Sequence, residues 1–127
     1  MGNKIDVFII DDDTQSMQYF QSIVNKGDGI RCIGSTTSGE NAVAIVATAY
    51  PDVVLVDYAL YPMSGFEILM QLQSEMPNVP IIMLGGRPNL EEKAKSAGAA
   101  AYLPTPITPR VLIDTIIAVK RNDERPA

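Results

Sequence analysis

Five nearly continuous apolar runs, each followed by a segment with helical spacing of its apolar residues, constrain this fold most strongly. The strand candidates span residues 5–10, 29–36, 52–57, 79–86 and 99–104, and the helix candidates span 14–26, 38–50, 64–76, 89–97 and 108–121. Strands that are apolar throughout are typical of a parallel sheet covered by helices on both faces. The sequence predicts one α/β domain over residues 1–121, with 122–127 as a polar tail or the start of a linker.

Several residues at the helix ends have the types and spacing that start or stop a helix. Ser64 and Glu67 have capping-box spacing, and so do Thr37 and Glu40. Asn89 is the expected cap of the fourth helix, with a glycine at position 98 as its stop, and a proline at position 109 opens the last helix.

The composition excludes several classes of chemistry. The 127 residues contain no histidine and a single cysteine, which excludes a Ser-His-Asp triad, a Cys-His pair and a cysteine-based zinc cluster. The net charge of −5 argues against direct binding of nucleic acid. There is no apolar run of about 18 residues, so no membrane span is predicted. The short polar N-terminus favours a cytoplasmic location.

Three consecutive acids, Asp11, Asp12 and Asp13, follow the first strand directly, and Asp57 ends the third. Ligands of doubly wound sheets bind beyond the carboxyl ends of the strands. In the flavodoxin-like strand order 2-1-3-4-5 the first and third strands are neighbours, so the carboxylates of Asp11, Asp12 and Asp57 would converge on a pocket that suits a hard cation such as Mg²⁺. Alternatively, residues 11–13 form a helix N-terminus, with one cap and two charges on the positive end of the helix dipole.

The strings "VFIIDDD", "PDVVLVD", "MSGFEIL", "PIIML" and "AYLPTP" together resemble the receiver domain of bacterial two-component response regulators, in order and over nearly the whole chain. The resemblance implies a (βα)₅ flavodoxin-like doubly wound parallel sheet. It implies that Asp57 accepts a phosphoryl group from a partner kinase's phosphohistidine, and that the domain is not itself an enzyme. It also implies a Mg²⁺ site in which Asp12 and Asp57 bind directly, Asp11 binds through water and the Ala59 carbonyl is a further ligand.

The sequence departs from this family at two functional positions. Receivers usually carry Thr or Ser where this chain has Gly85, and Lys where it has Thr105. Tyr102 occupies the position of the aromatic residue that rotates on activation, and without a hydroxyl at position 85 it is expected to be an ordinary half-buried strand residue. Two groups could take the place of the lysine that receivers carry at position 105. One is the Thr105 hydroxyl, which carries no charge. The other is Arg87, whose side chain either covers the pocket or remains in solvent.

The last helix is unusually apolar for a surface helix. One stripe is expected to face the core, Ile113 and Ile117 are expected to project away from it, and Val111 and Ala118 flank its other side; the stripe consists of Leu112, Thr115, Ile116 and Val119. The excess favours contact with an effector domain or a second copy of the chain, while scattered exposed apolar residues are the alternative.

Three functions are therefore weighed. The first is a phosphoacceptor receiver whose partner is a sensor histidine kinase or a phosphotransfer protein. The second is a pseudo-receiver that docks proteins independently of phosphorylation, which the residues at positions 85 and 105 favour. The third is a phosphatase of the haloacid-dehalogenase type, but "DDDT" is one residue short of the Asp-x-Asp-x-Thr motif of those enzymes. Neither a nucleic acid nor a membrane is expected as a direct partner.

Overall fold

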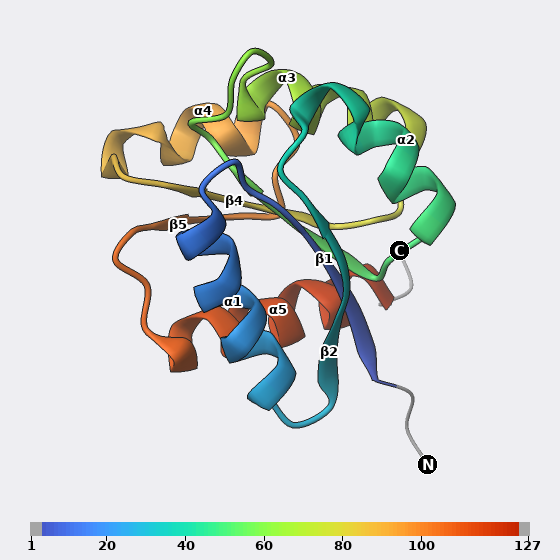
Figure 1. The fold of residues 1–127 in the computed structure, drawn as a ribbon, viewed down its shortest axis with the longest axis vertical. Coiled ribbons are helices and arrows are strands. Elements are labelled where there is room, and N and C mark those ends of the chain that lie inside the picture. Colours follow the sequence, from blue (N-terminus) through green and yellow to red (C-terminus); the bar gives the residue numbers. More distant parts are fainter. Residues whose placement is uncertain (1–3, 125–127) are drawn as a thin grey trace.

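The computed structural model describes residues 4–124 and contains one five-stranded parallel sheet in the order β2-β1-β3-β4-β5, as predicted (Figure 1). The strands are β1 (Ile5–Ile10), β2 (Ile30–Thr36), β3 (Val53–Asp57), β4 (Ile81–Gly85) and β5 (Ala101–Pro104). The helices are α1 (Thr14–Lys26), α2 (Gly39–Ala49), α3 (Gly65–Glu75), α4 (Glu91–Ser96) and α5 (Pro109–Glu124), with a short 3₁₀ turn, η1 (Pro88–Leu90), before α4.

The helices form two layers around the sheet. Helices α1 and α5 cover one face, and α2, α3 and α4 cover the other (Figure 1). The two cores draw alternate residues from β3, where Val54 and Val56 face α2 and α3 while Val53 and Leu55 face α1 and α5. Because both faces are covered, the central strands are apolar at nearly every position, with Asp6 in β1 and Asp57 at the end of β3 as the exceptions.

The α3 cap is confirmed, and the α2 cap is not. Ser64 Oγ accepts from the Glu67 N–H at 3.3 Å while Glu67 Oε1 accepts from the Ser64 N–H at 3.4 Å, which is a complete capping box. The predicted box of Thr37 and Glu40 is wrong. Helix α2 is capped one residue later, by Ser38, without a side-chain hydrogen bond to the helix backbone, so Glu40 lies one position too early to close a box.

The boundaries of the last two helices also differ from those predicted. Asn89 lies within the 3₁₀ turn instead of capping a helix, and α4 starts at Glu91. Gly98 follows the end of α4 with a φ of +114°, a conformation that glycine adopts without strain, and confirms the predicted stop. Pro109 opens α5 as predicted, but this helix continues to Glu124, into the predicted tail; residues 125–127 lie outside the described residues.

The apolar excess of α5 is mostly explained by core packing. Leu112, Ile116 and Val119 are buried as predicted. Ile113 and Ile117 do not project away from the core: both are half-buried and pack against it, because α5 contacts α1 as well as the sheet. Val111 remains 45% exposed. Within residues 4–124, every helix is too short or too polar to cross a membrane.

Candidate functional site

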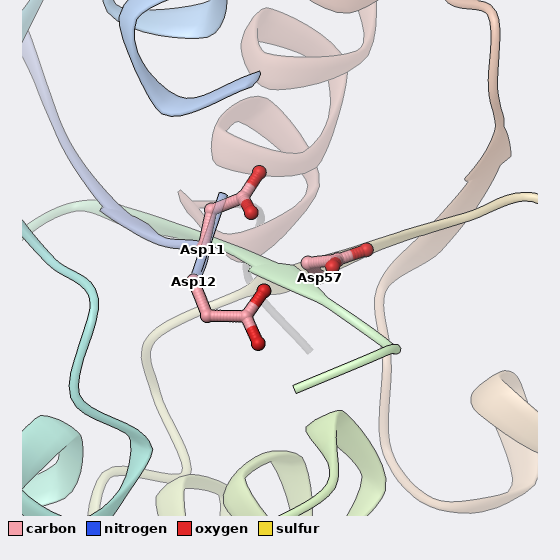
Figure 2. A group of neighbouring side chains, drawn as sticks. All are labelled: Asp11, Asp12 and Asp57. Atoms are coloured by element: carbon pink, nitrogen blue, oxygen red, sulfur yellow. The ribbon is translucent and has the colours of Figure 1, made fainter. Parts of the chain in front are cut away.

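The register of the two central strands brings the predicted acids together. Ile10 of β1 pairs with Val56 of β3, so Asp11 and Asp57 leave the sheet side by side at its carboxyl edge. One carboxylate oxygen from each of Asp11, Asp12 and Asp57 lies within 4.8 Å of the other two. Figure 2 shows the three carboxylates gathered around one space at the ends of β1 and β3.

Asp13, the third acid of the run, has a separate role. It caps α1, where its side chain accepts hydrogen bonds from the Gln15 N–H at 3.2 Å and from Ser16 Oγ at 2.9 Å. The acidic run is therefore divided: Asp13 caps the helix, and the carboxylates of Asp11 and Asp12 lie together with that of Asp57.

Asp11 is the acid most affected by its surroundings. Its side chain is 3% exposed, and burial raises its pKa to about 6, with further increases from the charges of Asp57, Asp12 and Asp13. The Asp13 N–H donates to Asp11 Oδ1 at 2.9 Å and lowers this pKa in part. Burial thus disfavours the charged form, and the neighbouring acids add to that effect.

Asp57 is half-buried, and its pKa is raised in the same way. Burial is the main cause and the charges of Asp12 and Asp13 add to it, while the backbone N–H groups of Tyr58 and Ala59 lower the pKa by hydrogen bonding. Within residues 4–124, the charged side chains that shift the pKa values of Asp11 and Asp57 are all acids. Ionised together, these carboxylates repel one another, and a divalent cation with oxygen ligands would offset the repulsion.

The loop after β3 is anchored to the first turn of α3. The Gly65 N–H donates to the Tyr58 carbonyl at 3.0 Å, and Gly65 is buried against the backbone of Asp57 and Tyr58. Ala59 lies in this loop, exposed and two residues past Asp57. The start of α3 therefore fixes the backbone that carries Asp57, a role for Gly65 that the sequence pattern did not reveal.

The positions expected to act as a switch lie at the ends of β4 and β5. Gly85 is buried at the end of β4, and Thr105 Oγ1 donates to its carbonyl at 3.3 Å. The expectation of a half-buried Tyr102 is wrong: this side chain is 4% exposed, and its hydroxyl donates to the Arg87 carbonyl. Tyr102 turns inward because Gly85 has no side chain to occupy that space. The Arg87 side chain is exposed and is not among the charges that shift the pKa of Asp57.

Asp11→Asn is expected to raise the free energy of unfolding of the metal-free protein at pH 7 by about 2 kcal/mol. The folded pKa of about 6 lies above the usual value of 3.8, so the charge of Asp11 destabilises the folded state in full above about pH 6, and this penalty is lost as the pH falls towards 4. The amide oxygen of Asn keeps an acceptor for the Asp13 N–H. Urea denaturation in EDTA at several pH values measures the difference.

The matched control is Asp13→Asn, which keeps a capping side chain and is expected to change stability by less than about 0.5 kcal/mol. An Asp11→Asn variant no more stable than the wild type at pH 7, or a difference that persists unchanged at pH 4, would contradict the electrostatic account.

Comparison with known proteins identifies the family. Residues 7–117 match the family model described as the response regulator receiver domain. A protein-glutamate methylesterase/protein-glutamine glutaminase of Methanospirillum hungatei is 33% identical over 107 residues, which cover 80% of this chain and 30% of that protein. The DNA-binding response regulator MtrA of Mycolicibacterium paratuberculosis is 31% identical over 126 residues, covering 95% of this chain and 54% of MtrA.

Solved structures agree with this assignment. A CheY-like response regulator receiver domain from Methanospirillum hungatei superposes with a TM-score of 0.85 at 26% identity, over 97% of this chain and 98% of that one. The chain spans 19% to 56% of the length of the curated relatives with which it was compared. It belongs to the response regulator receiver domain family.

Proposed function

We propose that Asp57 accepts a phosphoryl group from the phosphohistidine of a sensor histidine kinase or a phosphotransfer protein, in a Mg²⁺-dependent reaction, and that the domain has no enzymatic substrate of its own. The observation that carries this proposal is the convergence of Asp57 with Asp11 and Asp12 at the carboxyl edge of the sheet. A receiver domain of two-component signalling needs an acceptor carboxylate beside a metal site, and these three residues supply both.

In the proposed step, a carboxylate oxygen of Asp57 attacks phosphorus, the new P–O bond forms as the P–N bond of phosphohistidine breaks, and the leaving imidazole keeps the electron pair and takes a proton from solvent. Asp11, Asp12, Asp57 and the Ala59 carbonyl would hold Mg²⁺, consistent with an oxygen donor set. When bound, Mg²⁺ supplies positive charge that offsets the charge on the transferring group. Burial of Asp57 limits the water that competes with its carboxylate for the phosphorus atom.

The proposed receiver is atypical in how it stabilises and transmits the phosphorylated state. With Gly85 at the end of β4, no hydroxyl from that position reaches the phosphoryl group, and Thr105 offers a hydroxyl in place of a charge. The absence of one charge-assisted contact is expected to weaken transition-state stabilisation by ~2–4 kcal/mol. Phosphorylation at Asp57 would then be slower than with a lysine present.

The second candidate is a pseudo-receiver that docks proteins independently of phosphorylation. The observation that favours it is the buried position of Tyr102, whose hydroxyl donates to the Arg87 carbonyl beside a glycine at position 85. In either case the output partner is proposed to be an effector domain or a second copy of the chain, and the exposed Val111 on α5 is a candidate contact.

Intact-mass analysis after incubation with Mg²⁺ and acetyl phosphate tests the proposal. The wild type is expected to gain one phosphoryl group, whereas Asp57→Ala, or the wild type in EDTA, gains none. Asp13→Asn is the matched control, and we expect it to react like the wild type because Asp13 caps α1 outside the pocket. An adduct that persists in Asp57→Ala would contradict the assigned acceptor. No adduct combined with no Mg²⁺ binding would favour the pseudo-receiver.

A further inference from the structure

The side chain of Tyr102 occupies the space into which a side chain at position 85 would project. A Cβ atom placed on Gly85 would lie 2.5 Å from the Tyr102 hydroxyl oxygen and 3.3 Å from two of its ring carbons, Cε1 and Cζ. Contacts below 3.0 Å are essentially absent between real Cβ atoms and their neighbours. The observed position of Tyr102 is therefore compatible with glycine at position 85 and with no larger residue.

Tyr102 on β5 and Thr105 directly after it hold the segment from Gly85 to Leu90 at two points, the Arg87 and Gly85 carbonyls. The Tyr102 hydroxyl donates to the Arg87 carbonyl, which also accepts from the Leu90 N–H at 3.3 Å. At the start of the segment, the Gly85 carbonyl accepts from the Thr105 N–H at 2.7 Å. If the Tyr102 ring rotated away from Gly85, its hydrogen bond to the Arg87 carbonyl would break. The rotation would also leave a cavity beside β4 that a glycine cannot fill.

We propose that Gly85, Tyr102 and Arg87 form a fixed lock that holds the segment from Gly85 to Leu90 in one conformation whether or not Asp57 carries a phosphoryl group. The second half of this statement rests on the proposed function. A phosphoryl group shifts a two-state equilibrium only through contacts that differ between the states, and Gly85 has no side chain with which to make such a contact. The surface beside η1 and α4 would then be presented to partners constantly.

A double-mutant cycle between positions 85 and 102 tests the lock. Gly85→Ala is expected to lower the folding equilibrium constant by about tenfold or more, because the added methyl group overlaps the Tyr102 hydroxyl. In a Tyr102→Phe background the overlapping oxygen is gone, and we expect the same substitution to cost less than about threefold. Equal costs in the two backgrounds would overturn the lock.

Gly86→Ala is the matched control for the added methyl group. The neighbouring glycine has only Thr105 Oγ1 near its Cβ position, at 3.8 Å, which is an ordinary contact. We expect Gly86→Ala to change the folding equilibrium constant by less than about threefold, independently of residue 102. A cost at position 86 as large as at position 85 would show that strand-end glycines are required here for backbone reasons, and would also overturn the lock.

NMR spectra of the backbone amides and the tyrosine rings test whether the lock is independent of phosphorylation. They are recorded with and without Mg²⁺ and beryllium fluoride, which acts as a phosphoryl mimic. Signals from residues around Asp57 are expected to shift, while those of the Tyr102 ring and of the Arg87, Asn89 and Leu90 amides keep their positions. Movement of the Tyr102 ring would overturn the lock. If no signal around Asp57 shifts, the proposed function fails at the metal and phosphoryl site, and the mutant cycle alone decides the lock.

Discussion

Gly65→Ala is expected to destabilise the protein by about 3 kcal/mol or more and to reduce phosphorylation of Asp57, whereas Gly39→Ala is expected to change stability by less than about 1 kcal/mol. Both glycines are the first residue of a helix, α3 and α2 respectively, so helix propensity affects them alike. They differ in what lies next to them. A Cβ on Gly65 would overlap the carbonyl oxygen of Asp57 and lie 2.6 Å from Tyr58 Cα.

The overlap at Gly65 cannot be relieved cheaply, because the atoms involved are backbone. The Gly65 N–H is hydrogen-bonded to the Tyr58 carbonyl, and Asp57 ends a central strand, so relief requires moving α3 away from the site. At Gly39 the nearest atom is Ile68 Cδ1 at 3.3 Å, the end of a flexible side chain. Urea denaturation gives the stabilities, and intact-mass analysis gives the phosphorylated fraction.

The prediction is contradicted if Gly65→Ala costs no more stability than Gly39→Ala. If Gly65→Ala is destabilised yet phosphorylated as fast as the wild type, the stability part of the prediction holds and the phosphorylation part fails. The tight approach of α3 to β3 would then matter for folding and not for the placement of Asp57.

The fold was predictable because its main signal is local. Five apolar strands alternating with helices predict a covered parallel sheet, and a proline or glycine marks several of the boundaries. The meeting of Asp11 with Asp57 is not a local property, since 46 positions separate them in the sequence. It followed from the strand order of a flavodoxin-like doubly wound sheet, in which the first and third strands are neighbours, and the β1–β3 register confirms that pairing.

The features that sequence reasoning missed depend on contacts between separate elements. The inward position of Tyr102 depends on the missing side chain at Gly85, on a neighbouring strand. The half-burial of Ile113 and Ile117 depends on α1 lying beside α5, which helical periodicity alone does not report. In each case the residue pattern is correct, and what it cannot give is the identity of the neighbour that fills the adjacent space.

Thr105→Lys is expected to accelerate phosphorylation by acetyl phosphate about 30-fold or more, the lower end of the ~2–4 kcal/mol expected for one charge-assisted contact. Thr105 follows β5 at the carboxyl edge of the sheet, next to the end of β4, and its exposed side chain leaves room for a longer one. A cation there would face acids whose pKa values are raised by burial and by one another. Intact-mass measurements on samples quenched at successive times give the rate of phosphorylation.

The matched control is Thr105→Gln, which is of similar length to Lys, removes the same threonine hydroxyl and adds no charge. We expect its rate to stay within about threefold of the wild type, because the gain depends on charge. A second readout separates charge from shape: the pKa of Asp57, followed by carbon NMR, should fall in the Lys variant and not in the Gln variant, since a nearby cation favours the ionised carboxylate. If both variants react alike and neither lowers this pKa, then a side chain at position 105 does not reach the acids. The slow step of phosphorylation would in that case be limited by something other than the missing charge.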